Sequence, residues 1–192
     1  MKIGKTLRVR DRKEWRSWLA ANHKSAADIW LVFFHKASGK AGVAYNDVVE
    51  EALCFGWIDS IVKNLDHESH AQRFSPRRAG SVLSELNKER VKKLIAQKKM
   101  TKAGLAAIAH AFAPAEYKTE DFALAPDIIA ALKKAPAAWA NFRKFPAGYR
   151  RIRIGYIESQ RKHGPAALKR SLLHFVKRTA LNKRIGIARD SF

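Results

Sequence analysis

The stretch WIDSIVKNLDHESHAQRFSP, residues 57–76, indicates an antiparallel hairpin. Two short runs rich in strand-favouring residues, Trp57 to Lys63 and His70 to Ser75, are joined by the polar turn KNLDHE. Upstream, the run IWLVFFH, residues 29–35, is too short for a buried helix and is rich in aromatic and β-favouring residues, so we expect a strand in the middle of the sheet. Together these segments predict a small antiparallel sheet of about three strands.

One helix is expected before the strand at residues 29–35 and another after it. Asp11 and Glu14 have the spacing of a capping box, which predicts a helix over residues 12–22. Asn46 is expected to cap a second helix. That helix should stop at Gly56, because glycine readily adopts the left-handed conformation found after a helix C-terminus.

From Ser84 onward the sequence carries no further strand signal, and helices are expected over residues 85–97 and 102–112. Each of the later prolines can occupy the first turn of a new helix, where its missing N–H is not needed. The sequence therefore predicts an α+β fold, with a small antiparallel sheet and helices in an N-terminal unit followed by a basic C-terminal helical region.

The expected organisation has three parts. Residues 1–112 form the N-terminal α+β unit, residues 113–125 (APAEYKTEDFALA) form a hinge, and residues 126–192 form the basic C-terminal helical region. Packing of the first and last parts into one domain stays open. A chain of 192 residues and 21.7 kDa is too short for a multi-domain machine.

Charge is the unusual property of this chain. With 47% hydrophobic residues it is expected to fold, because disorder needs low hydrophobicity alongside high charge. Its net charge is nevertheless +21, and residues 128–189 carry 16 Lys or Arg against one acid. This bias favours an anionic partner such as nucleic acid, another polyanion, an anionic membrane or an acidic small ligand.

Several classes of site are not indicated. The single cysteine, Cys54, excludes an internal disulfide and is expected in the core. The patterns GxSxG, GxGxxG, HExxH and the P-loop are absent, and His67 with His70 gives only a weak metal signal. We therefore predict no catalytic residues, no metal and no cofactor, while the question of an enzyme stays open. The basic start MKIGKTLRVR has no apolar stretch behind it, so we expect a cytoplasmic protein.

Three segments resemble one known family. ALCFGWIDS (residues 52–60), RFSPRRAGSVLSELNKERV (73–91) and MTKAGL (100–105) are similar to the YdeI/OmpD-associated family, whose members are also labelled bacteriocin-protection proteins. The stretch from Pro126 to Arg184 resembles that family's C-terminal helical segment. The resemblance implies a bacterial stress or bacteriocin-protection protein, and it implies no particular reaction because the family has none established.

The first group of candidate site residues lies around the hairpin. If Asp59 faces a cleft, it can orient the guanidinium of Arg73, Arg77 or Arg78 for binding phosphate or carboxylate; the alternative is that Asp59 is a structural salt-bridge or turn partner. Pro76 ends the strand ladder and leaves Arg77 on a loop that could hold an anion at the next helix N-terminus, unless that loop is simply a solvated turn. The candidate ligand- or anion-binding residues are Trp57, Asp59, Arg73, Arg77, Arg78, Ser84 and Asn87.

The second group lies in the C-terminal region. Over residues 166–180 a helical wheel separates an apolar side with Leu168, Leu172 and Phe175 from a basic side. The alternative to binding is that this basic side only keeps the protein in solution. The candidate polyanion-binding residues are Arg150, Arg151, Arg161, Lys169, Arg170, Lys177 and Arg178.

Three functions are consistent with these observations. The first is a non-enzymatic protein that binds nucleic acid or another polyanion through the basic helical face. The second is a small-molecule-binding protein or enzyme, with a cleft lined by Trp57, Asp59, Arg77, Ser84 and Asn87. The third is a peripheral envelope-stress protein that acts through protein contacts or anionic lipid.

Overall fold

The computed structural model describes residues 2–113, 116–118, 122 and 124–186. It consists of two compact units. The first comprises Met1–Val82 and Arg90–Ala113, and the second comprises Leu83–Glu89 and Pro114–Phe192. Positions 114–115, 119–121 and 123 of the predicted hinge lie outside the described residues, as do positions 187–192 of the predicted basic region.

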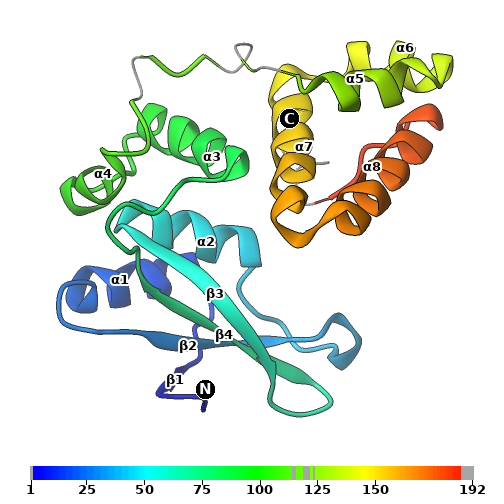
Figure 1. The fold of residues 1–192 in the computed structure, drawn as a ribbon. Coiled ribbons are helices and arrows are strands. Elements are labelled where there is room, and N and C mark those ends of the chain that lie inside the picture. The colour runs from blue at the N-terminus through cyan, green and yellow to red at the C-terminus, as the bar shows by residue number, and fades with distance from the viewer. Residues whose placement is uncertain (1, 114–115, 119–121, 123, 187–192) are drawn as a thin grey trace. The chain divides into compact units, whose positions relative to one another are not determined.

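The first unit contains most of the N-terminal elements (Figure 1). Their bounds are β1 Thr6–Leu7, α1 Arg12–Asn22, β2 Ile29–Phe34, a 3-10 turn at Lys36–Ser38, α2 Tyr45–Cys54, β3 Trp57–Asn64, β4 Ser69–Pro76 and α4 Lys102–Ile108. Helix α3, Glu85–Ala96, begins among the residues of the second unit and continues in the first.

The sheet has four strands in the order β1-β2-β4-β3. Strand β1 runs parallel to β2, whereas the other neighbours are antiparallel, and β3 with β4 forms the predicted hairpin. The prediction of an α+β fold is confirmed, and so is the interior position of β2. The predicted number of strands was one too low, because β1 has only two residues and shows no alternating pattern.

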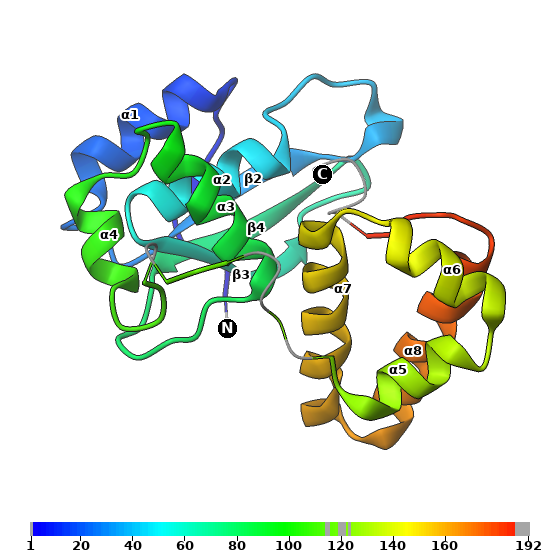
Figure 2. The same cartoon turned by 90° about the horizontal axis from the view of Figure 1, so that it is seen from above.

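Helices α1 and α2 lie on one side of the sheet, as Figures 1 and 2 show. The indole of Trp15, which is fully buried, donates a hydrogen bond to the carbonyl of Val48 at 3.0 Å and so ties α1 to α2. Glu51 is 2% exposed and accepts hydrogen bonds from the guanidinium groups of Arg12 and Arg16. Both a buried neutral hydrogen bond and charged contacts therefore hold the two helices together.

Helix boundaries show where local signals succeed. Asp11 caps α1 by accepting a hydrogen bond from the backbone N–H of Glu14 at 2.9 Å, as predicted. The prediction for α2 was wrong by two residues, since Ala44 occupies the N-cap and makes no side-chain hydrogen bond. Asn46 lies inside that helix and accepts a hydrogen bond from Arg90 instead.

Helix α4 packs unusually close to the end of α2. The backbone N–H and the hydroxyl of Thr101 both donate to the carbonyl of Cys54, at 3.0 and 2.7 Å. A Cβ atom placed on Gly104 would lie 2.1 Å from the same carbonyl oxygen, so only glycine permits this approach. The helix ends at Ile108, before the predicted residue 112.

The second unit is helical. It contains α5 Pro126–Lys133, α6 Pro136–Lys144, α7 Ala147–Ser159, a 3-10 turn at Gln160–His163 and α8 Pro165–Ala180, together with the first turn of α3. As predicted, proline begins α5, α6 and α8. The core is formed by inward residues of α5 to α8, among them Ile128, Leu132, Phe142, Tyr149, Ile157 and Phe175.

Candidate functional site

Asp59 is the centre of a polar network in the first unit. Its Oδ2 atom accepts hydrogen bonds from the Tyr45 hydroxyl at 2.7 Å and from the Gln72 side-chain amide at 2.8 Å. Strand pairing places Asp59 opposite Phe74, so Asp59, Gln72 and Phe74 share one face of the sheet. Burial and the Asp59 charge raise the pKa of Tyr45 to about 12, which keeps this phenol protonated as a donor at neutral pH.

Two arginines lie close enough to Asp59 to interact electrostatically. Burial lowers the pKa of both Arg77 and Arg90, and the Asp59 carboxylate partly opposes that shift. The Arg77 guanidinium donates to the Val82 carbonyl at 3.0 Å, while its Nε is enclosed without a hydrogen-bond partner. Glu50 also interacts electrostatically with Arg90, and it forms an ion pair with Arg12 at 2.9 Å.

Arg73 and Trp57 do not join this network. Arg73 pairs with Asp28 at 2.7 Å, which corrects the expectation that Asp59 could orient it. Trp57 is 1% exposed, donates to the His23 carbonyl at 3.2 Å and packs edge-on against Trp18. Trp57 is therefore a core residue of the first unit.

The remaining candidates near the hairpin lie apart from Asp59 in the chain. Arg78 is exposed. Ser84 accepts a hydrogen bond from the backbone N–H of Asn87 at 3.3 Å, so Ser84 caps α3. Both Ser84 and Asn87 are counted with the second unit. Of the predicted cleft residues, the structure brings Asp59 and Arg77 together, and it brings Ser84 and Asn87 together.

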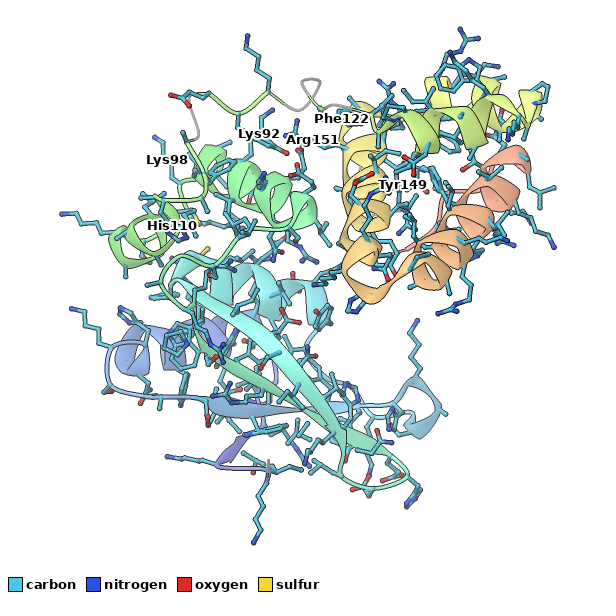
Figure 3. The ribbon with its side chains drawn as sticks, viewed as in Figure 1. Lys92, Lys98, His110, Phe122, Tyr149 and Arg151 are labelled. Atoms are coloured by element: carbon cyan, nitrogen blue, oxygen red, sulfur yellow. The ribbon has the colours of Figure 1, made fainter. Side chains whose placement is uncertain are left out.

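Two of the seven predicted polyanion-binding residues are already paired with carboxylates. Arg151 is only 11% exposed, forms an ion pair with Glu85 and lies 4.4 Å above the ring of Tyr117; Figure 3 labels it beside Phe122. Arg161 forms ion pairs with Asp127 at 2.9 Å and with Glu158 at 2.8 Å. Both arginines therefore contribute to the internal structure of the second unit.

Helix α8 carries three of the exposed cations of the second unit. Leu168, Leu172, Phe175 and Val176 pack against the core, as predicted. Lys169, Arg170 and Lys177 are exposed, and none of them forms an ion pair with a described residue. We call these three residues, together with His174, the basic face of α8. Arg170, His174 and Lys177 are spaced by four and three residues and so share one side of the helix, and Lys169 lies beside Arg170 at the edge of that side.

Other residues of the basic region are less exposed than predicted. Arg178 is half-buried, and its Nε is enclosed without a hydrogen-bond partner; the same holds for Arg150. Sequence analysis missed Arg153, which is 8% exposed. Its position four residues after Tyr149 and four before Ile157, both buried, was the available signal that it points inward.

No feature of the described residues indicates a nucleophile or a metal centre. Cys54 is buried, and burial raises the pKa of its thiol to about 11, so the thiol stays protonated at neutral pH. Within the described ranges, no group of three metal-ligating side chains is present. No helix in those ranges has the length and apolar character needed to span a bilayer.

Family comparisons follow the two units of the structure. Residues 7–107 match a domain of unknown function, DUF8412, and residues 121–163 match the family described as bacteriocin-protection, YdeI or OmpD-associated. Neither the curated proteins nor the solved structures gave a match. The resemblance to the YdeI/OmpD-associated family is thus confirmed at residues 121–163, whereas the N-terminal motifs fall in the other match. The chain belongs to the DUF8412 family and carries a YdeI/OmpD-associated bacteriocin-protection domain in its helical region.

Proposed function

We propose that this protein is a non-enzymatic binder of nucleic acid, and that the basic face of α8 makes the contact. The observation that carries the proposal is the set of three exposed cations, Lys169, Arg170 and Lys177, without carboxylate partners among the described residues. Of the seven candidate residues, Arg151 and Arg161 are paired with carboxylates and Arg150 and Arg178 are half-buried, so these three on α8 are the candidates that stay available to a partner.

The expected contacts are to phosphates. Lysine and arginine on a helix surface neutralise phosphates and release counterions, which gives affinity without sequence information. Three contacts predict a slope of about −2.7 in log K against log salt for B-DNA, and hence about a 40-fold loss of affinity between 50 and 200 mM salt. Sequence-specific recognition is not part of the proposal.

The test is fluorescence anisotropy of labelled duplex and single-stranded oligonucleotides with nuclease-treated, full-length protein. The variant Lys169→Glu/Arg170→Glu/Lys177→Glu should lose binding. A matched control, Lys13→Glu/Lys24→Glu/Lys102→Glu, changes the net charge equally at three exposed lysines of the first unit and should retain binding. An equal loss of oligonucleotide affinity in both variants would show that binding depends on net charge, and it would contradict a specific role for α8.

A second candidate function is attachment to an anionic lipid surface. Leu173, which is 60% exposed, lies on the same side of α8 as Arg170 and Lys177, and Leu181, just after the helix, is 56% exposed. Apolar residues among cations are typical of helices that lie in a membrane interface. Flotation with vesicles of anionic lipid, but not with zwitterionic ones, and loss of flotation in Leu173→Ser, would support this function over nucleic-acid binding.

A small-ligand site at Asp59 is the remaining alternative. The enclosed Nε of Arg77 supports it, because a ligand acceptor could satisfy that donor. The Asp59 carboxylate at the centre of the network argues against a strongly anionic ligand there. Binding of a ligand that is lost in Arg77→Met and kept in the α8 variant would favour this alternative.

A further inference from the structure

Arg153 is a buried cation without a counter-ion among the described residues. It lies on α7 with 8% of its surface exposed, and its guanidinium carbon is 4.8 Å from the ring centroid of Tyr156 and 5.8 Å from that of Phe175. The Nε atom is enclosed and has no hydrogen-bond partner. Burial lowers the pKa of Arg153, with opposing contributions from Tyr149 and Tyr156.

Another buried guanidinium of the second unit, that of Arg151, has the partners that Arg153 lacks. Two residues earlier on α7 and similarly enclosed, Arg151 pairs with the Glu85 carboxylate and donates to the Lys118 carbonyl at 2.7 Å. Aromatic faces attract Arg153 weakly, but they leave its hydrogen bonds unmade. An unpaired buried charge is strongly destabilising, so an anion that pairs with it would gain correspondingly.

Two further cations lie above other aromatic rings of this unit. Arg150, one helical turn before Arg153, lies 5.7 Å above the ring of Phe142, which contacts Phe175 at 6.1 Å between centroids. The Nε of Arg150 is also enclosed without a partner. Arg184 lies 5.9 Å above the ring of Tyr149, a buried residue of α7 labelled in Figure 3.

The chain after α8 passes close to Arg153. The Tyr149 hydroxyl accepts a hydrogen bond from the backbone N–H of Ile185 at 2.8 Å, which holds this segment in place. A Cβ atom on Gly186 would lie 2.8 Å from the Nη1 atom of Arg153. Because Gly186 has no side chain and a φ of +79°, the backbone approaches this guanidinium without placing a methyl group against Nη1.

We propose that Arg153, with Arg150 one helical turn away on α7, binds a small oxyanion of the phosphate class. The planar guanidinium presents paired donors that match the geometry of such an anion. This site differs from the basic face of α8, because Arg153, the residue that would bind the anion, is enclosed among aromatic rings. The proposal therefore does not depend on nucleic-acid binding.

The test is a titration of the full-length protein with inorganic phosphate in the low millimolar range at constant ionic strength. The readouts are the Nε–Hε resonance of Arg153, identified by its loss in Arg153→Lys, and the thermal midpoint. We expect a saturable shift of that resonance and a rise of the midpoint in the wild type and in Arg170→Met, which removes one exposed charge from α8. Arg153→Lys should bind about tenfold more weakly, because a point charge replaces the fork of donors.

Arg153→Met should abolish the response to phosphate and raise the midpoint measured without phosphate, since the uncompensated charge is removed. If this variant does not fold, Gly186→Ala serves instead, because its methyl group would occupy the space beside Nη1 while keeping the charge. An equal response to phosphate in the wild type and the variants, or none in the wild type, would overturn the proposal.

One further control concerns the chain itself. Asp190, outside the described residues, is the only acidic residue that follows Glu158 in the sequence. If only Asp190→Asn bound phosphate saturably, and the wild type did not, Asp190 would be the counter-ion of Arg153. That result would also overturn the proposal. Loss of oligonucleotide binding in the α8 triple variant with phosphate binding intact would separate this site from the proposed function.

Discussion

Replacing Gly104 with alanine should destabilise the first unit, although alanine is the better helix former. The added Cβ would lie 2.1 Å from the Cys54 carbonyl oxygen, 2.6 Å from its carbon and 3.0 Å from the Leu53 carbonyl oxygen. These are backbone atoms of α2, so they cannot move away by a side-chain rotation. Helix α4 must therefore shift away from the end of α2.

The magnitude follows from three contributions. Overpacking of this kind costs about 1–3 kcal/mol, and weakening the two hydrogen bonds from Thr101 to Cys54 costs about 1 kcal/mol each. Alanine regains up to about 1 kcal/mol over glycine in a helix. The expected net loss in free energy of unfolding is about 2–4 kcal/mol, or a urea midpoint lower by about 1–2 M for a typical slope.

The assay is urea unfolding followed by tryptophan fluorescence, which reports mainly on the first unit because four of the five tryptophans lie there. Ala106→Gly, an exposed position of the same helix, calibrates helix propensity alone and should cost about 1 kcal/mol. A Gly104→Ala midpoint equal to or above that of the wild type would refute the close packing of α4 on α2.

Three further predictions concern charged and titrating groups. Glu51→Gln removes the buried carboxylate that Arg12 and Arg16 share, but Arg12 keeps its ion pairs with Asp47 and Glu50, so the loss in urea unfolding should be about 1.5–3 kcal/mol; an unchanged urea midpoint would contradict this. Burial raises the pKa of Glu85, but its hydrogen bonds to Lys88 and Arg151 prevail and hold it below the usual value. The stability from Glu85 is therefore present above the unfolded-state pKa and lost as pH falls through the folded pKa; circular dichroism should show the difference between wild type and Glu85→Gln shrinking from pH 7 to pH 3, and a constant difference would contradict it. The Cys54 thiol should react with a disulfide reagent at neutral pH only as fast as the protein opens, and reaction at the rate of an exposed thiol would contradict its burial.

Much of the fold follows from local patterns in the sequence. The hairpin, the interior strand and helix α1 are encoded by short apolar runs, a polar turn and the Asp11 cap. Strand β1 has no such signal, since two residues give no periodicity and its pairing with β2 comes from the rest of the chain. The cap predicted at Asn46 failed because a tertiary contact with Arg90 uses that side chain.

The candidate site was less predictable, because charge alone does not show which cations are paired. Arg151 and Lys177 carry the same charge in the sequence, yet the carboxylate that pairs with Arg151 is 66 positions away. Arg153 was missed because arginine is normally expected on the surface. Its spacing of four residues from Tyr149 and from Ile157 did indicate an inward position, but its contact with the ring of Phe175 on another helix could not be read from the sequence.

The salt dependence of oligonucleotide binding tests the central claim most directly. Anisotropy titrations between 50 and 200 mM salt should give a wild-type slope that is steeper, by about 2.7 in log K against log salt, than the slope of Lys169→Glu/Arg170→Glu/Lys177→Glu, because three phosphate contacts are lost. The control substitutions at Lys13, Lys24 and Lys102 should leave the slope unchanged. A wild-type slope near zero, or equal slopes for the wild type and the α8 variant, would contradict binding through the basic face of α8.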